Sequence, residues 1–501
     1  GKSLTLAMLE AYYDVVYAND FDELFGHLYI GQHPTPKHNC YLIMRFNFSE
    51  VSSNVNEVER SFKLHCCSKL RDFVFKYEDL LGKEIWDVLD EEIQQDPFLS
   101  AINSYASRKG NLPIYLLIDE YDNFTNTILS TYGTEYYQKA THGEGFVRGF
   151  FNVIKAATTG TGSALQRMFI TGVSPVTMDD VTSGFNIGTN ITTDPWFNDL
   201  VGFSEAELRE MLTYYKEQGV LMQTVDETIV MMKPNYDNYC FSEEKLAQCM
   251  FNSDMALYFM KSFVLHHVKP KEIVDPNIRT DFNKLAYLIR LDHGLGENFS
   301  VIKEIAEQGE ITTDIATHFS ALEMTDVRNF KSLLFYFGLL SIKGVDMVGR
   351  PILHVPNLVV REQLFSFLIQ GYIKHDIFKI DMNRMTMLFE NMAFRGDWKP
   401  LFNFIAEAIR EQSRIREYIE GEAHIKGFLL AYLGMYRYYQ LYPEYELNKG
   451  FADFLFKPSP SVPVMPPLTY LLEVKYAKAG ASEKEIRALA DEAREQLLRY
   501  S

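Results

Sequence analysis

The sequence is short of cysteine, of long apolar runs and of positive charge, and each shortage excludes a class of protein. The five cysteines form no C-x-x-C pair, which argues against a zinc site and a disulfide framework and fits a reducing cytoplasm. The longest apolar stretch, residues 333–342, is too short to span a bilayer, so we expect no membrane partner. Both ends of the sequence look cut, and we expect a fragment of a longer protein.

Basic residues are outnumbered: 49 Lys and Arg face 67 Asp and Glu, a formal net charge of −18. This balance argues against a chain coated in nucleic-acid-binding surface, although it does not exclude a local basic groove. Hydrophobic residues at 47% and aromatic residues at 14% indicate well-packed cores. A chain of 501 residues is too long for one ordinary core, so two or three domains are expected.

Short apolar strands alternate with helical patterns in the first 200 residues. The predicted strands are Cys40–Phe48, Pro113–Ile118 and Arg167–Val173. Strands separated by helices indicate a mostly parallel α/β sheet. We therefore predict a domain at residues 1–200.

From Ser204 the pattern becomes helical, with Ser204–Glu207 as an N-cap and first turn. Two β-like segments around Val345–Pro351 suggest a winged-helix-like region, and an all-helical lid with one loop is the alternative. This predicted region covers residues 201–375. A small α/β domain is predicted at residues 376–501, with helices to about Tyr442 and then strands at Phe451–Phe456 and Thr469–Tyr476.

The sequence opens on the last part of a phosphate-binding loop motif. Gly1-Lys2-Ser3 followed directly by a helix matches the end of G-x-x-x-x-G-K-[ST]. In that chemistry the lysine contacts the β- and γ-phosphates, the hydroxyl ligates Mg²⁺, and the helix N-terminus adds its dipole. ATP and Mg²⁺ are the cofactors that these residues predict.

Two further strand ends carry polar side chains suited to the same site. The apolar strand before Asp119 and Glu120 delivers two carboxylates to the sheet edge at which ligands bind. Asp119 would hold Mg²⁺ and Glu120 would polarise the attacking water. Thr171 ends the next strand and could present its hydroxyl to the γ-phosphate. Arg148 and Arg167 lie in no context that identifies an arginine finger.

A second set of residues, near the C-terminus, has the chemistry of phosphodiester hydrolysis. The E-x-K spacing of Glu473 and Lys475 places acid and lysine side by side on one face of a strand. Asp453 on the preceding strand completes the set, with Gly450 before it and acids at positions 444 and 446. Asp453, Glu473 and the Val474 carbonyl are oxygen ligands suited to Mg²⁺, and Lys475 would position or deprotonate the nucleophile.

The three N-terminal segments resemble a bacterial AAA-ATPase-like family that often carries a PD-(D/E)XK nuclease domain at its C-terminus. The resemblance includes the segments Gly1–Leu4, Leu117–Asp122, Ile170–Ser174, Phe197–Ser204 and Leu353–Glu362. Residues 444–453 are similar to the segment before the catalytic aspartate of that nuclease domain. Gln496 and Tyr500, four residues apart, resemble a later exonuclease motif, and Glu422 resembles the acid on the first helix. The resemblance implies a P-loop NTPase sheet with a helical lid, followed by a restriction-endonuclease-like domain.

These patterns predict an ATPase module coupled to a Mg²⁺-dependent nuclease acting on DNA. The alternative is a nucleotide-switched signalling or scaffold protein whose nuclease fold is an inactive binding module, and the charge of −18 favours it slightly. A third hypothesis, an ATPase with a structural tail, requires the E-x-K spacing to be accidental. The sequence does not distinguish DNA from RNA as the substrate, and it identifies neither the position of the cut nor whether the chain forms a homo-oligomer.

Overall fold

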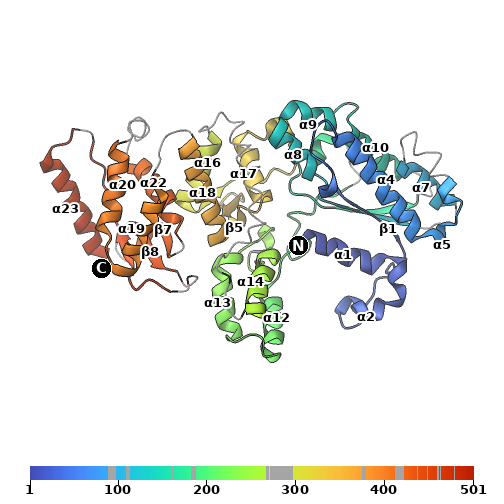
Figure 1. The fold of residues 1–501 in the computed structure, drawn as a ribbon, viewed down its shortest axis with the longest axis horizontal. Helices are drawn as coiled ribbons and strands as arrows, with labels where there is room; N and C mark the ends of the chain where they lie inside the picture. Colours follow the sequence, from blue (N-terminus) through green and yellow to red (C-terminus); the bar gives the residue numbers. More distant parts are fainter. Residues whose placement is uncertain are drawn as a thin grey trace. The chain divides into compact units, whose positions relative to one another are not determined.

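The fold is described from a computed structural model, which covers most of the chain. The described residues are 1–87, 98–108, 113–158, 163–181, 188–266, 270, 297–374, 380–411, 422–436, 438–447, 450–459, 462, 464–478 and 480–500. They form two compact units, traced in Figure 1. The first unit is Gly1–Gly202 with Ile315–Phe337, and the second is Phe203–Asp314 with Gly338–Ser501. The division expected at residues 200 and 375 stays a prediction.

A parallel three-stranded sheet lies at the centre of the first unit. The strands β1 (Leu42–Asn47), β2 (Ile114–Asp119) and β3 (Leu165–Ile170) pair in the order β1-β2-β3. Because all three run in the same direction, their carboxyl ends meet at one edge of the sheet. The predicted parallel α/β sheet is confirmed, and each strand end lies within about three residues of its predicted position.

Helices cover both faces of this sheet (Figure 1). Leu6 of α1 packs with Ile43 and Leu117 on one face. On the other face Phe46 lies 5.5 Å from Phe150 of α10, between ring centroids, and α4 packs on β1. Successive strand residues point to opposite faces, and both faces are apolar, as a sheet buried on both sides requires. The helices of this part of the unit are α1 (Lys2–Tyr13), α2 (Phe21–Phe25), α3 (Tyr29–Gln32), α4 (Val58–Lys76), α5 (Glu78–Leu81), α7 (Phe98–Arg108), α8 (Asn123–Tyr132), α9 (Thr134–Thr141), α10 (Phe146–Thr158) and α11 (Val176–Val181).

A segment distant in sequence completes the first unit. Residues 315–337, which contain η6 (Ala321–Glu323) and α17 (Val327–Tyr336), pack with the sheet domain after the chain has passed through part of the second unit. The backbone N–H of Ala321 donates to Asp180 Oδ2 of α11 at 3.0 Å. Sequence patterns did not predict this return, because it depends on a contact across 141 residues.

The second unit begins with helices α12 (Glu205–Glu217), α13 (Val225–Tyr236) and α14 (Ser253–His266) around a shared apolar core. The predicted N-cap is confirmed: Ser204 Oγ accepts from Glu207 N at 3.2 Å, and Glu207 accepts from Ser204 N at 2.8 Å. This reciprocal pair is a capping box, which satisfies two backbone donors at the helix start.

Two small antiparallel sheets and further helices complete the second unit. One sheet has the order β4-β6-β5 and the other has the order β7-β8-β9. The strands are β4 (Glu310–Thr312), β5 (Ser341–Val345), β6 (Pro351–His354), β7 (Tyr439–Leu447), β8 (Gly450–Pro458) and β9 (Tyr470–Leu472). The helices are α16 (Glu297–Gln308), α18 (Leu358–Lys374), α19 (Met382–Arg395), α20 (Lys399–Glu411), α22 (Glu422–Gly434) and α23 (Glu483–Tyr500).

Two predictions for the region from Tyr439 onward are wrong in detail. Residues 439–447 were expected to begin as helix but form strand β7, because they pair along their length with β8. The strand predicted to reach Tyr476 ends at Leu472. There the Val474 N–H donates to the Asp453 carboxylate at 2.6 Å and leaves the strand ladder.

Candidate functional site

The carboxyl ends of β2 and β3 bring together the polar residues predicted for the first site. We call Asp119, Glu120, Thr171 and Lys2 the β2–β3 site. Thr171 Oγ1 donates to Asp119 Oδ1 at 2.7 Å, and Asp119 is fully buried. Its other oxygen, Oδ2, has no hydrogen-bond partner within the described ranges. A buried carboxylate oxygen without a donor is costly, and a bound cation would satisfy it.

Lys2 extends from the start of α1 to the same strand ends. Its ammonium donates to the Gly172 carbonyl at 2.8 Å and lies 4.0 Å from Glu120 Oε1. Gly1 is the N-cap of α1, and its carbonyl accepts the first helical hydrogen bonds. Ser3 lies exposed in the first turn of α1 and makes no hydrogen bond with Asp119 within the described residues. Of the predicted loop residues, the structure therefore brings Lys2 to the strand ends and leaves Ser3 outside the cluster.

Glu120 follows β2 in an uncommon backbone conformation. Its φ of 54° lies in the left-handed region, which is unfavourable for residues other than glycine. This turn leaves the Glu120 side chain a quarter exposed, while Asp119 is buried. Strain of this kind is found at functional sites more often than elsewhere.

Two residues that sequence patterns did not single out hold the loop after β3 in place. Asp122 accepts from the backbone N–H groups of Val173 and Ser174 at 3.0 and 2.9 Å. The Tyr121 hydroxyl donates to the Ser174 carbonyl, and burial raises the pKa of Tyr121 well above its usual value. A Cβ at Gly172 would lie 2.2 Å from the Tyr121 ring, so this close approach requires glycine. The run Asp-Glu-Tyr-Asp at residues 119–122 was the only sequence feature that could have indicated these contacts.

The second set of predicted residues meets where β8 and β9 lie side by side. We call Asp453, Glu473, Lys475 and Lys426 the β8–β9 centre. Asp453 on β8 is nearly buried, and its Oδ2 accepts from Val474 N. Lys475 Nζ lies 3.4 Å from Glu473 Oε1, so the predicted pairing of acid and lysine is confirmed.

The negative charge of the buried Glu473 carboxylate has few polar partners around it. Only 5% of its side chain is exposed, and Oε2 has no hydrogen-bond partner among the described residues. Burial, followed by the neighbouring Asp453 carboxylate, raises the pKa of Glu473. As at Asp119, an orphaned buried oxygen beside a second carboxylate is what a divalent cation would stabilise.

The sequence analysis did not identify Lys426. This residue of α22 contacts Asp453 Oδ1 and lies 3.1 Å from Glu444 Oε1 and 3.2 Å from Glu422 Oε1. The four-residue spacing of Glu422 and Lys426 on one helix face was a signal that could have found the pair. Asn448 and Lys449, in the predicted approach to Asp453, lie outside the described residues.

The last helix, α23, contacts Lys475 of the β8–β9 centre and the first residues of β8. Glu492 of α23 lies 3.4 Å from Lys475 Nζ. The Tyr500 hydroxyl donates to the Phe451 carbonyl at 2.8 Å, against Gly450 with a φ of 149°. Gln496 Oε1 is buried with no hydrogen-bond partner in the described part of the chain. The two residues of the predicted exonuclease motif therefore differ, because the Tyr500 hydroxyl has a hydrogen-bond partner on β8 whereas Gln496 Oε1 has none among the described residues.

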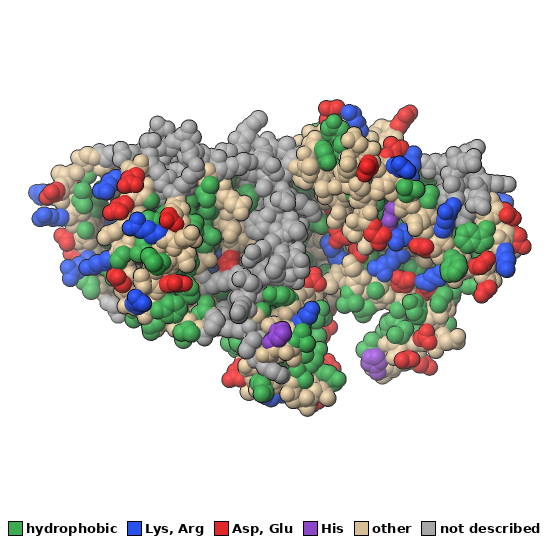
Figure 2. Space-filling view, in the orientation of Figure 1, with side chains coloured by type: hydrophobic (Ala, Val, Ile, Leu, Met, Phe, Trp, Pro, Cys, Tyr) green, Lys and Arg blue, Asp and Glu red, His purple; other side chains and the backbone are tan. Residues whose placement is uncertain are grey.

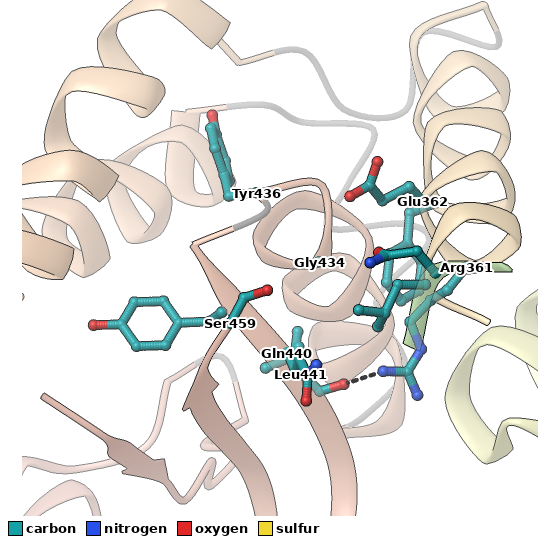
Figure 3. Close-up of a pocket in the computed structure, with 11 residues that line it drawn as sticks. Arg361, Glu362, Gly434, Tyr436, Gln440, Leu441 and Ser459 are labelled. Carbon is teal, nitrogen blue, oxygen red and sulfur yellow. Dashed lines mark hydrogen bonds between the residues drawn. The ribbon is translucent and has the colours of Figure 1, made fainter. Parts of the chain in front are cut away.

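A small cavity in the second unit lies between α18 and β7 (Figure 3). It measures about 20 Å³, which has room for one water molecule. Arg361 Nη1 donates to the Leu441 carbonyl at 2.7 Å, and burial lowers the pKa of Arg361. The cavity contains none of the predicted site residues, and its arginine joins a helix to a strand.

No ready-made metal cage exists in the described part of the chain, because no three His, Cys, Asp or Glu side chains there are grouped to hold an ion. A metal at the β8–β9 centre would therefore take two side-chain carboxylates, with backbone carbonyl and water as its other ligands. None of the described helices has the length and apolar character needed to cross a bilayer. Figure 2 shows Lys and Arg side chains interspersed with Asp and Glu over the described surface in view.

Comparisons with known proteins agree with this geometry. Residues 1–182 match the family described as predicted AAA-ATPase, and residues 420–501 match the PD-(D/E)XK nuclease superfamily. Searches of curated proteins and of solved structures each gave no significant match. The first match contains the whole β2–β3 site and the second contains the whole β8–β9 centre. The chain therefore carries an AAA-ATPase-like domain at residues 1–182 and a PD-(D/E)XK nuclease superfamily domain at residues 420–501.

Proposed function

We propose that the chain is an ATP-dependent, Mg²⁺-requiring nuclease that cuts DNA at the β8–β9 centre. The observation that carries the proposal is the pairing of buried Asp453 and Glu473, which leaves one carboxylate oxygen without a donor beside Lys475. The superfamily that this region matches is described as a nuclease superfamily, and its name gives the same residue types in the same order, an aspartate and then D/E-x-K.

Each residue of the β8–β9 centre has a chemical role in this proposal. Asp453 Oδ1, Glu473 Oε2 and the Val474 carbonyl would hold Mg²⁺. A bound Mg²⁺ would polarise a water molecule and neutralise charge on the phosphate. Lys475 positions that water against the phosphate, because Glu473 on one side and Glu492 on the other fix its ammonium. Tyr500 orients the β8 backbone beside Asp453.

The proposed role of the N-terminal domain is to bind and hydrolyse ATP at the β2–β3 site. Lys2 would contact the β- and γ-phosphates, and Ser3 and Asp119 would hold the nucleotide's Mg²⁺. Glu120 would orient the attacking water, supported by its strained turn out of β2. Thr171 fixes the Asp119 carboxylate and faces the same strand edge. A P-loop arrangement, a winged-helix-like region around β5 and β6, and a bacterial cytoplasmic setting belong to this proposal.

A direct test is cleavage of linear duplex DNA, single-stranded DNA and RNA with Mg²⁺ or Mn²⁺. Wild type would be compared with Asp453→Ala, Lys475→Ala and the control Glu446→Ala, an exposed residue of β7. We expect metal-dependent cutting of DNA that both active-site variants lose by about 100-fold or more and the control retains. Equal cutting by all four proteins would contradict the proposal.

The second candidate is a nucleotide-switched scaffold in which the nuclease fold only binds. The net charge of −18 and the mixed surface charges of Figure 2 favour it. Binding of DNA without cutting, by wild type and by Asp453→Ala alike, would support the scaffold. Coupling is tested with Lys2→Ala: a cutting rate and ATP dependence equal to wild type would exclude gating by nucleotide.

A further inference from the structure

Both oxygens of the Asp453 carboxylate are already engaged. Oδ2 accepts from the Val474 N–H at 2.6 Å, and Oδ1 contacts the Lys426 ammonium. The backbone contact fixes the chain after β9, so Oδ2 is committed to the fold. Oδ1 is therefore the oxygen of Asp453 that a metal would use, and Lys426 covers it.

Glu473 is engaged differently. Its Oε1 lies 3.4 Å from Lys475 Nζ, while its Oε2 has no partner among the described residues. A metal that approaches the β8–β9 centre can bind Oε2 of Glu473 without moving Lys475. Lys426 and Lys475 are thus not equivalent, because only Lys426 contacts a carboxylate oxygen, Asp453 Oδ1, that the metal would bind.

Lys426 also has other carboxylates within reach. Glu444 Oε1 and Glu422 Oε1 lie 3.1 and 3.2 Å from its ammonium. Their side chains are 60% and 36% exposed, whereas the Asp453 side chain is 6% exposed. An ammonium that leaves Asp453 can therefore keep two partners in a more solvated position, which lowers the cost of displacing it.

We propose that Lys426 is an internal competitor of the metal: it neutralises Asp453 in the metal-free protein and moves towards Glu422 and Glu444 when a divalent cation binds. The inference rests on the proposed function, since it concerns the metal of the same centre. Lys426 is then a positioning residue that sets the metal affinity, and its departure leaves a cation beside the position of the phosphate. The centre stays neutralised in both states, so the buried carboxylates are never left without a counter-charge.

The test is calorimetric titration of Mn²⁺ and Mg²⁺ into the full chain, which measures binding without turnover. Lys426→Met removes the ammonium and keeps an unbranched side chain, so we expect the metal to bind at least about tenfold more tightly. Lys303→Met is the matched control: Lys303 of α16 packs beside Gly427, next to Lys426, but pairs with Glu307 instead of Asp453. Its affinity should stay within about threefold of wild type, as should that of Lys426→Arg, which keeps the charge.

A second pair of variants tests whether the metal displaces Lys426, and it leaves the contact between Lys426 and Asp453 in place. Glu444→Gln removes one of the alternative partners of Lys426, so the metal should bind more weakly than to Glu446→Gln, which removes an exposed charge on the same strand. Equal metal affinities for wild type, Lys426→Met and Lys303→Met would overturn the inference alone. If Lys426→Met does not fold, equal affinities for the Glu444 and Glu446 variants overturn it. No metal binding by any protein would overturn the proposed function and the inference with it.

Discussion

The two candidate sites hold their carboxylates with different kinds of partner. Around the β2–β3 site the hydrogen-bond donors to three buried aspartates are neutral: a hydroxyl for Asp119, backbone N–H groups for Asp122, and the Tyr137 hydroxyl for Asp180, while the Lys2 ammonium lies 4.0 Å from the more exposed Glu120. In the β8–β9 centre lysine ammonium groups contact the carboxylates, Lys426 at Asp453 and Lys475 at Glu473. Buried carboxylates thus have neutral hydrogen-bond donors in one part of the chain and lysine ammonium groups in another.

This difference corresponds to the charge that each site is expected to receive. At the β2–β3 site Lys2 donates to a backbone carbonyl and lies 4.0 Å from Glu120, so its charge is available to a polyanion such as a nucleotide. In the β8–β9 centre the lysines neutralise the carboxylates, and an incoming cation must compete with one of them. We interpret Lys2 as available for phosphate, whereas Lys426 must be displaced by the metal that the second site is proposed to hold.

The largest expected effect is at Glu473, where we expect a substitution to lower DNA cleavage without lowering the stability of the fold. Glu473→Gln should lower metal-dependent cleavage by about 100-fold or more, because a ligand of the metal is lost. The thermal unfolding temperature should stay equal or rise, since burial already raises the pKa of this carboxyl and disfavours its charged form. Cleavage rates and thermal unfolding of the variant and of Glu446→Gln provide the measurement. A clear loss of stability would mean that Glu473 is a structural residue, which would break the comparison.

The opposite outcome is expected at Asp122, whose partners are backbone groups. Asp122→Ala leaves the buried Ser174 N–H and the half-buried Val173 N–H without an acceptor and should lower the free energy of unfolding by about 2–3 kcal/mol. Urea denaturation measures the loss, and hydrogen exchange of peptides from β2 and β3 assigns it to the first unit. The exposed control Glu144→Ala should change stability by less than about 0.5 kcal/mol. A stable Asp122→Ala protein would show that this carboxylate does not hold the loop.

A smaller effect is expected from the hydroxyl at Thr171. Thr171→Val removes the donor to Asp119 Oδ1 and leaves both oxygens of that buried carboxylate unsatisfied, at a cost of about 1 kcal/mol. Thr171→Ser keeps the donor and should stay close to wild type. Denaturant unfolding of the three proteins checks the prediction. Equal stability of the Val and Ser variants would mean that Asp119 does not depend on the hydroxyl.

The smallest effect is a pH dependence at Asp180. Burial raises the pKa of Asp180 above its ordinary value of 3.8, against the hydrogen bonds from Tyr137 and Ala321 and the nearby His142. Between the ordinary value and the raised one, the folded state keeps a proton that the unfolded state has lost. Stability therefore falls as pH rises through this window, with a slope of at most about 1.4 kcal/mol per pH unit.

Asp180→Asn should remove this slope, because an amide does not titrate. Denaturant unfolding of wild type and variant at a series of pH values, starting just below the ordinary carboxyl pKa, measures the difference between them. Asp179 and His142, which act on Asp180, are present in both proteins. A difference that is flat with pH would contradict the raised pKa.

Local patterns predicted much of this molecule, and contacts distant in sequence account for what they missed. The strands before Asp119 and Thr171 follow from strand periodicity, and the structure confirms them. The structure also pairs Glu473 with Lys475, although both residues lie beyond the end of β9 at Leu472. Strand β7 was missed because its pairing with β8 decides its conformation.

Lys426 was missed for the same reason. It contacts Asp453 across 27 positions, and no local pattern records that contact. The early end of β9 has a similar cause, because Asp453 takes the Val474 N–H that a longer strand would use.

The most direct test of the account is a crystal structure of the chain soaked with Mn²⁺, with the ion located by its anomalous signal. We predict a peak in direct contact with Asp453 Oδ1 and Glu473 Oε2, with the Lys426 ammonium moved to Glu422 and Glu444. A peak elsewhere, or an empty centre in which Lys426 still contacts Asp453 at saturating Mn²⁺, would contradict the assignment of a metal-dependent nuclease site.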